Sequence, residues 1–318
     1  MNKIMTTVNE SHSIQRALTF VSQSDTMRTL YFLLMVLLLP AASPVLAARP
    51  QLLLDVARFR NTDASVKGSV VEIYATVPGQ WLTYMRRAPK MYQAAAILTL
   101  EIMRPDGQAA YQENITLKPP VLSDTSAAIK NPLSFQKRLV LPDGAYTIRG
   151  LVRDQYRSSQ QALVEMPLVL TSTNAKPTLS DLVLLAKPAA KGTEASNFSR
   201  GGFGLTRAPG GTYARGADKL WLYTELYNAA PKQEVQLRYR LRAVNGKADV
   251  LTQASTARGV AGRPTPITSE LDISKLPAGD YTLITEVRTA KQLLATQTTM
   301  VHRITTDYAP AGAAAPAR

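Results

Sequence analysis

The sequence predicts an all-β protein, with two tandem β-sandwich domains of the immunoglobulin or fibronectin III type after a signal peptide. Three observations indicate this class: a motif Leu-Pro-x-Gly-x-Tyr-Thr that occurs twice, strand-like alternation of apolar and polar residues, and an apolar N-terminal run that ends in small residues. A chain of 318 residues suits two domains. Its 45% hydrophobic and 19% charged residues are ordinary for a packed globular protein.

The N-terminal region has the pattern of a secretory signal peptide. Arg28 precedes an almost wholly apolar run over 30–39, and Val45 and Ala47 place small residues before a cleavage site. The run is short for a membrane helix, which needs about 20 residues. We therefore expect residues 1–47 to be a signal peptide, with an uncleaved anchor as the alternative.

Export sets the expected compartment, which is the periplasm or the extracellular space. Residues 1–26 are polar, and Met27 is a candidate for the true first residue. The chain has no cysteine, which excludes disulfides, thiol nucleophiles, cysteine-bound zinc and a lipoprotein anchor. Its net charge of +14 favours weak affinity for anionic surfaces. Because the basic residues are scattered, no nucleic-acid partner is expected, and membrane contact is expected only through an uncleaved anchor.

The internal repeat extends beyond the twofold motif. LPDGAYTI at 141–148 returns as LPAGDYTL at 276–283, and each copy follows an apolar strand pattern that ends in a turn. These turns contain Asp106-Gly107 and Asn245-Gly246, where glycine is expected at positive φ. A third match, of 71–75 with 220–224, fits one strand earlier in each copy. Three matches in the same order indicate a duplicated unit.

Alternation with a period of two predicts strands with one buried face. This pattern covers residues 71–77, and only residues 86–95 resemble a short helix. The clearest case has apolar residues at Val235, Leu237, Tyr239 and Leu241. Because side chains alternate across a strand, these four lie on one face, and we expect the opposite face to be in water.

The repeated motif predicts a tight corner. Proline fixes φ and glycine permits turn conformations that other residues avoid, so the chain reverses before the tyrosine. Tyr146 and Tyr281 then begin the next strand with their rings in the core. Their hydroxyls can bond to the backbone of the corner, as in the tyrosine corner of sandwich folds.

The predicted domain boundaries follow from these patterns. The first sandwich covers 50–173 and the second covers 176–307. The second contains a Gly/Ser/Arg-rich insertion at 189–216, which we expect to be a flexible loop, and loops of that length are often functional. The Ala/Pro/Gly-rich tail at 308–318 is expected to be disordered.

Residues for catalysis or metal binding are scarce. His302 is the only histidine after residue 47, and no Gly-x-Ser-x-Gly sequence supplies a serine nucleophile. No spacing of acidic residues matches a calcium loop, and no two carboxylates stand out as a catalytic pair. Gly201, Gly202 and Gly204 lack the Gly-Lys-Ser/Thr of a phosphate-binding loop. We expect neither an enzyme nor a cofactor.

Two groups of residues are candidate contacts with a ligand or partner. Trp221 and Tyr223 lie on a strand that looks buried on both faces, so they are either core residues or, with Trp81, a stacking platform for sugar rings. A row of arginines either binds an acidic partner or forms a solvated sheet face. This row consists of Arg238, Arg240 and Arg242.

Several short motifs resemble one known family. These are LSDLVLL at 179–185, FGL at 203–205, Tyr213 and KLWLYTELYN at 219–228, together with the paired corner motifs. They are similar to the sandwich region of GWxTD-domain proteins from the Bacteroidetes. The resemblance implies an exported protein of a Gram-negative bacterium and carries over no functional residues. The Gly-Trp-x-Thr-Asp sequence itself is missing from this chain.

These patterns together predict an exported, non-catalytic binding or scaffold protein of the bacterial cell envelope. Its expected partner is an envelope protein or a polysaccharide. The alternative is a carbohydrate-binding module that uses exposed aromatic residues.

Overall fold

The computed structural model describes most of the chain after residue 51, as strands and two 3-10 turns. The turns are η1 (Gly79–Trp81) and η2 (Pro209–Gly211). The described ranges are 52–63, 65–126, 130–172, 176–192, 199–230, 232–260 and 262–305. No helix in these ranges is long and apolar enough to cross a membrane. The predicted signal peptide and C-terminal tail lie outside them.

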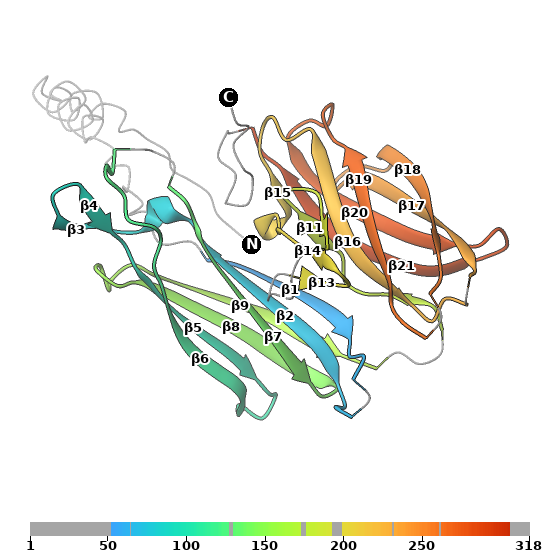
Figure 1. The fold of residues 1–318 in the computed structure, drawn as a ribbon, viewed down its shortest axis with the longest axis horizontal. Helices are drawn as coiled ribbons and strands as arrows, with labels where there is room; N and C mark the ends of the chain where they lie inside the picture. The colour runs from blue at the N-terminus through green and yellow to red at the C-terminus, as the bar shows by residue number, and fades with distance from the viewer. Residues whose placement is uncertain are drawn as a thin grey trace, which may run out of the picture. The chain divides into compact units, whose positions relative to one another are not determined.

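Two sheets enclose a first core (Figure 1). The three-stranded sheet has the order β1-β2-β7, with β1 at Leu53–Arg60, β2 at Ser69–Val77 and β7 at Leu133–Leu141. The four-stranded sheet has the order β6-β5-β8-β9, with β5 at Ala96–Met103, β6 at Ala109–Leu117, β8 at Gly144–Asp154 and β9 at Gln161–Leu170. Buried residues such as Ile73, Leu98 and Ile148 fill the space between these sheets.

Two further sheets enclose a second core, which includes Leu222, Leu237 and Leu283. In one, β16 (Lys219–Tyr227) pairs with β19 (Thr265–Asp272), β10 (Thr178–Leu179) and β11 (Val183–Leu185). The other has the order β15-β21-β20-β17-β18, with β15 at Thr212–Tyr213, β17 at Glu234–Ala243, β18 at Asp249–Arg258, β20 at Gly279–Arg288 and β21 at Leu293–Arg303.

The repeat seen in the sequence is matched by the topology. The order β18-β17-β20-β21 reproduces β6-β5-β8-β9 strand for strand. The all-β prediction is confirmed for the described residues. The division near residue 174 stays a prediction, because residues 48–318 form one compact unit.

The predicted tyrosine corner is present in both copies. The hydroxyl of Tyr146 donates to the carbonyl oxygen of Pro142 at 3.0 Å, and that of Tyr281 donates to Pro277 at 2.8 Å. The glycine between proline and tyrosine has nearly the same φ in each copy, 155° at Gly144 and 152° at Gly279. The motif is therefore a structural device that ties the start of β8 or β20 to its own turn.

Strand β2 differs from the prediction that its outer face is in water. Val71, Ile73 and Ala75 point into the first core as expected. On the opposite face, however, Glu72 and Tyr74 are also buried. The expectation of burial on both faces of the strand at 219–227 is confirmed, because seven of the nine residues in β16 are buried and only Lys219 and Trp221 are partly exposed.

Two local expectations were wrong. Residues 86–95 do not form a helix, because β3 (Met85–Ala88) and β4 (Met91–Gln93) pair as a hairpin. Gly107 has the expected positive φ of 82°, but Gly246 is not among the glycines with positive φ. The turn between Arg242 and Asp249 reverses the chain without a positive φ at Gly246. It follows a shift in the register between β17 and β18 at Leu241 and Arg242.

The insertion at 189–216 is more ordered than a flexible loop. Its described residues form a small sheet in the order β12-β14-β13, with β12 at Ala190–Lys191, β13 at Ser199–Arg200 and β14 at Phe203–Gly204. They continue through η2 into β15, which pairs in parallel with the end of β21. The glycine-rich segment is therefore a folded part of the protein.

The tyrosine corner gives a direct stability test. We expect Tyr281→Phe to lower the free energy of unfolding by about 1 kcal/mol, because it removes one hydrogen bond and leaves a carbonyl oxygen without its partner. Urea denaturation measures the loss. Tyr92→Phe is the matched control, since its hydroxyl makes no hydrogen bond to a described residue, and equal losses in the two variants would contradict the corner's role.

Candidate functional site

A third cluster of buried residues joins the outer faces of β2 and β16. We call it the bridging cluster. It consists of Ala57, Phe59, Val70, Tyr74, Val183, Leu185, Leu205 and Tyr223. Phe203 from the insertion packs against it, with its ring centroid 6.2 Å from that of Tyr223. The insertion is thus part of the apolar contact between the strands of the first and second cores.

Within this contact, one guanidinium serves two buried carboxylates. Arg200 donates from Nε to Glu225 Oε1 at 2.8 Å and from Nη1 to Glu72 Oε1 at 3.2 Å. Glu72 and Glu225 are 1% and 3% exposed. The guanidinium also lies 3.7 Å from the ring centroid of Phe59, a cation–π contact. Burial disfavours its charge, but Glu225 and Glu72 outweigh that effect and raise the pKa of Arg200.

Tyrosine hydroxyls complete the carboxylate shells. Tyr223 donates to Glu225 Oε1 at 2.9 Å, Tyr227 donates to Glu225 Oε2 at 2.6 Å, and Tyr74 donates to Glu72. Burial, and then the adjacent carboxylate of Glu225, raise the pKa of Tyr223 and Tyr227 above the usual tyrosine value. These phenols therefore stay protonated and act as donors at neutral pH.

Two more arginines border this network. Arg138 on β7 donates from Nε to Glu72 at 2.8 Å and from Nη2 to the carbonyl of Ser199 at 3.0 Å. Arg207 stacks over Tyr74, with its guanidinium carbon 3.9 Å from the ring centroid. Its Nε and Nη1 are buried without a hydrogen-bond partner among the described residues.

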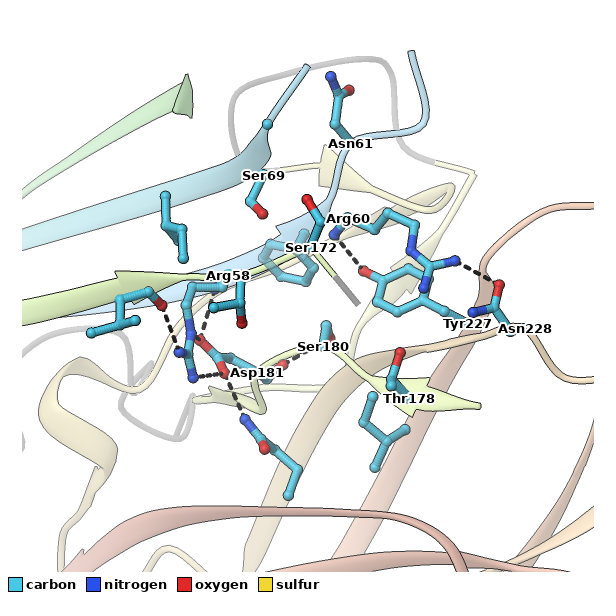
Figure 2. A pocket seen from close by; sticks show the side chains of 17 residues that line it. Arg58, Arg60, Asn61, Ser69, Ser172, Thr178, Ser180, Asp181, Tyr227 and Asn228 are labelled. Atoms are coloured by element: carbon cyan, nitrogen blue, oxygen red, sulfur yellow. Dashed lines mark hydrogen bonds and ion pairs between the residues drawn. The ribbon is translucent and has the colours of Figure 1, made fainter. Parts of the chain in front are cut away.

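A polar cavity of about 530 Å³ opens beside the bridging cluster, where β1, β9, β10, β16 and β21 meet. We call it the junction pocket; Figure 2 shows its side chains. The polar groups that line it include Arg58, Arg60, Ser69, Ser172, Thr178, Asp181, Asn228 and Gln297. Guanidinium, carboxylate, amide and hydroxyl groups thus face one cavity, next to the ring of Tyr227.

Arg58 and Asp181 form the best-defined pair in the pocket. Arg58 Nε and Nη2 each donate to a separate oxygen of Asp181 at 2.8 Å, so the pair is bidentate. The backbone N–H of Arg58 also donates to Asp181 at 2.8 Å, and Gln297 Nε2 donates to it at 2.6 Å. The hydrogen bond to Asp181 raises the pKa of Arg58. Asp181 is the acidic residue of the LSDLVLL motif, so that motif contributes to the pocket.

The other wall of the pocket is tied to the buried network. The Tyr227 hydroxyl, which donates to Glu225, accepts the backbone N–H of Arg60 at 3.0 Å. The Arg60 guanidinium lies 4.6 Å from the Tyr227 ring centroid and donates to Asn228 Oδ1 at 2.7 Å. This wall of the pocket is therefore tied through Tyr227 to the buried carboxylate of Glu225.

The structure buries Tyr223 completely and leaves Trp221 and Trp81 partly exposed. Tyr223 is 0% exposed, so an exposed stacking platform that includes it is wrong. Trp221 is partly buried, packs against the bridging cluster and donates from Nε1 to Glu270 at 3.0 Å. Trp81 lies in η1 and is partly buried, with its Nε1 lacking a hydrogen-bond partner among the described residues.

The predicted arginine row is largely paired within its own sheet. Arg240 contacts Asp249 at 3.2 Å and Glu286 at 2.7 Å, and Arg242 contacts Asp249 at 2.9 Å. Arg238 is exposed on the same face. Two of the three guanidinium groups are thus engaged by acidic residues of β18 and β20, which leaves Arg238 as the open position of the row.

His302, the histidine considered from the sequence as a catalytic residue, does not line the junction pocket. His302 lies on β21, where its Nδ1 is 2.7 Å from Asp280 Oδ1 on β20. No group of three or more His, Asp or Glu residues within the described ranges could hold a metal ion.

No family model and no curated protein matches this chain. Among solved structures, it is similar to a red sea bream transglutaminase (12% identity, TM-score 0.25), covering 89% of this chain and 34% of that one. It is also similar to latent PorU from Porphyromonas gingivalis (13%, TM-score 0.28), covering 84% and 21%. A Bacteroides uniformis β-glucuronidase matches at 12% identity and a TM-score of 0.28, covering 77% and 28%. This chain therefore spans about a third or less of each of these larger proteins, and the matches identify no family.

Because two buried carboxylates share the guanidinium of Arg200, we expect its loss to destabilise the protein more than the loss of an exposed ion pair. We expect Arg200→Met to destabilise the protein by roughly 3 kcal/mol, because it leaves two buried carboxylates without their common cation. The matched control is Lys219→Met on β16, which breaks contacts to the exposed side chains of Glu270 and Asp272 and should therefore cost much less. Urea denaturation measures both, and similar losses would refute a special role for Arg200.

Proposed function

We propose that this chain is an exported, non-catalytic binding or scaffold protein of the bacterial cell envelope, built from two tandem immunoglobulin-like sandwich domains. The signal-peptide pattern before residue 48 supports export. The repeated strand order and the paired tyrosine corners support two sandwich units.

The observation that carries the binding role is the junction pocket. Sites for polar ligands are concave and present a few fixed hydrogen-bonding groups. Here Asp181 is held in a bidentate pair with Arg58, and the wall at Tyr227 is tied to Glu225, so the polar groups are oriented before any ligand arrives. A pre-organised site loses less entropy on binding than a mobile one.

The lining favours binding over catalysis. Nucleophilic catalysis needs a nucleophile in hydrogen-bonding reach of a base that a third group orients. The pocket's carboxylate, Asp181, is already engaged by Arg58 and Gln297, and the hydroxyl of Ser180 bonds to Thr224. The lining groups are thus suited to donating and accepting hydrogen bonds with a polar partner.

Site-specific cross-linking tests where the partner binds. A photoreactive residue in place of Ser172, which is exposed at the pocket, should give discrete cross-linked products in cells that export the protein. The same residue in place of Thr256, exposed on edge strand β18, should not. Filling the pocket with Ser69→Trp should remove the products from the Ser172 position. If cross-linked products form at the Thr256 position and remain after Ser69→Trp, the partner binds at a sheet edge and not in the pocket.

A carbohydrate ligand is the second candidate, because the pocket combines amide, hydroxyl and carboxylate groups with the ring of Tyr227. A glycan array with wild-type protein tests it. If a sugar binds in the pocket, Gln297→Ala should weaken binding by about tenfold through loss of a hydrogen-bonding group, whereas Trp221→Ala should leave it unchanged. Loss in Trp221→Ala alone would place the sugar on the aromatic strand, and no binding at all would leave a protein partner as the favoured ligand.

A further inference from the structure

The hairpin of β3 and β4 carries exposed apolar and basic side chains side by side. Met85 and Met91 are each 45% exposed, which is unusual for large apolar residues. Arg86 and Lys90 are exposed between them, and neither pairs with an acidic side chain in the described part of the chain. Figure 1 shows this hairpin beyond the ends of β5 and β6.

Neighbouring loops extend the same chemistry. Tyr92 on β4 forms a β-bridge with Leu122, which brings the loop after β6 beside the hairpin. That loop exposes Lys118 and, at 46%, Val121. Across the hairpin, Arg87 stacks on Tyr156 at 5.0 Å, next to the turn before β9. We call the hairpin and these two loops the hairpin pole.

Acidic side chains do little to balance these cations. Asp154 is 0% exposed and accepts the backbone N–H groups of Thr83 and Tyr156. Asp124 is exposed in the loop after β6, but the exposed cations Arg86, Lys90 and Lys118 outnumber it. The outer surface of the pole is therefore basic and apolar.

The chain enters the described structure at this same end. Leu53 pairs with Thr76, near the end of β2, and η1 and the hairpin follow directly after β2. Only residues 40–51 separate Leu52 from the apolar run at 30–39. The part of the sequence predicted to engage a membrane during export thus joins the protein next to the hairpin pole.

We propose that the hairpin pole docks on the surface of an anionic phospholipid bilayer. Long, flexible methionine side chains suit shallow insertion among lipid headgroups, and basic residues beside them are attracted to anionic lipids. Charge complementarity and the position of the N-terminal chain favour a membrane over a soluble acidic partner. This contact does not require an uncleaved anchor, and it is independent of the junction pocket.

A single thiol label tests the contact. The chain has no cysteine, so Met85→Cys gives one site for an environment-sensitive fluorophore on the full chain. We expect the fluorescence to shift to the blue with vesicles that contain phosphatidylglycerol. With pure phosphatidylcholine vesicles we expect no shift, because these vesicles lack the negative charge that attracts the basic residues, and binding through the apolar N-terminal run does not bring the label into the bilayer. Val66→Cys, on the loop between β1 and β2 at the opposite end, is 46% exposed and should not shift with either.

Charge reversal in the labelled protein separates the pole from general basicity. Arg86→Glu with Lys90→Glu should weaken binding to the anionic vesicles by at least about tenfold. Lys67→Glu with Arg104→Glu makes the same change in net charge at the opposite end, where both residues are exposed, and should weaken it far less. Equal weakening by both pairs, an equal shift of the Val66→Cys label, or no response to anionic vesicles would overturn the proposal. Thermal unfolding checks that every variant remains folded.

Discussion

The guanidinium of Arg200 lies between the buried carboxylates of Glu72 and Glu225, which belong to different sheets. Much of the structure follows from the need to give each of these three buried charges enough partners. Burying charges costs several kcal/mol for each ion unless partners replace the lost water. Here Glu72 also receives Arg138, and Glu225 receives two tyrosine hydroxyls. The charges therefore dictate which surfaces of β2 and β16 must face each other and which residues must accompany them.

The same network explains why the insertion is folded. Arg200 sits on a two-residue strand within a glycine-rich segment that has little propensity to order itself. Its hydrogen bonds to Glu72 and Glu225, with the apolar contacts of Phe203 and Leu205, stabilise the segment from outside. Because Tyr227 links Glu225 to the backbone of Arg60, the order extends to the wall of the junction pocket. A buried electrostatic contact thus contributes to the rigidity of a surface cavity.

Local patterns in the sequence were sufficient to predict some of these elements. The alternation in 235–241, the tyrosine corners and the duplicated strand order depend on residues close to one another in the chain, so they could be recognised there. The outer face of β2 could not. Glu72 reads as a solvated residue of an alternating strand, and its partner Arg200 lies 128 positions away. The one local signal was the sequence Glu-x-Tyr at Glu72 and Glu225, where each tyrosine donates to the glutamate two residues before it.

The junction pocket was missed for the same reason, since Arg58 and Asp181 are 123 positions apart. Residues 86–95 contribute to a hairpin in place of the expected short helix, because β3 and β4 pair across the turn, and the local pattern of apolar residues does not show that pairing. For the junction pocket the information lies in contacts between distant segments, whereas for the hairpin it lies in a short-range pairing. The patterns that occur in both copies of the repeat specify the sandwich. The junction pocket and the hairpin have no counterpart in a second copy, and only the structure reveals them.

The features found in only one copy lie at opposite ends of the first pair of sheets. The junction pocket is lined by the ends of β1 and β9 and by the start of β2, whereas the hairpin pole follows the end of β2. If the hairpin pole rests on a bilayer, strands β1 and β2 direct the junction pocket away from the lipid, toward solvent. A membrane contact and a binding cavity would then operate together without competing for surface, because the antiparallel strands of one sheet keep them a strand's length apart.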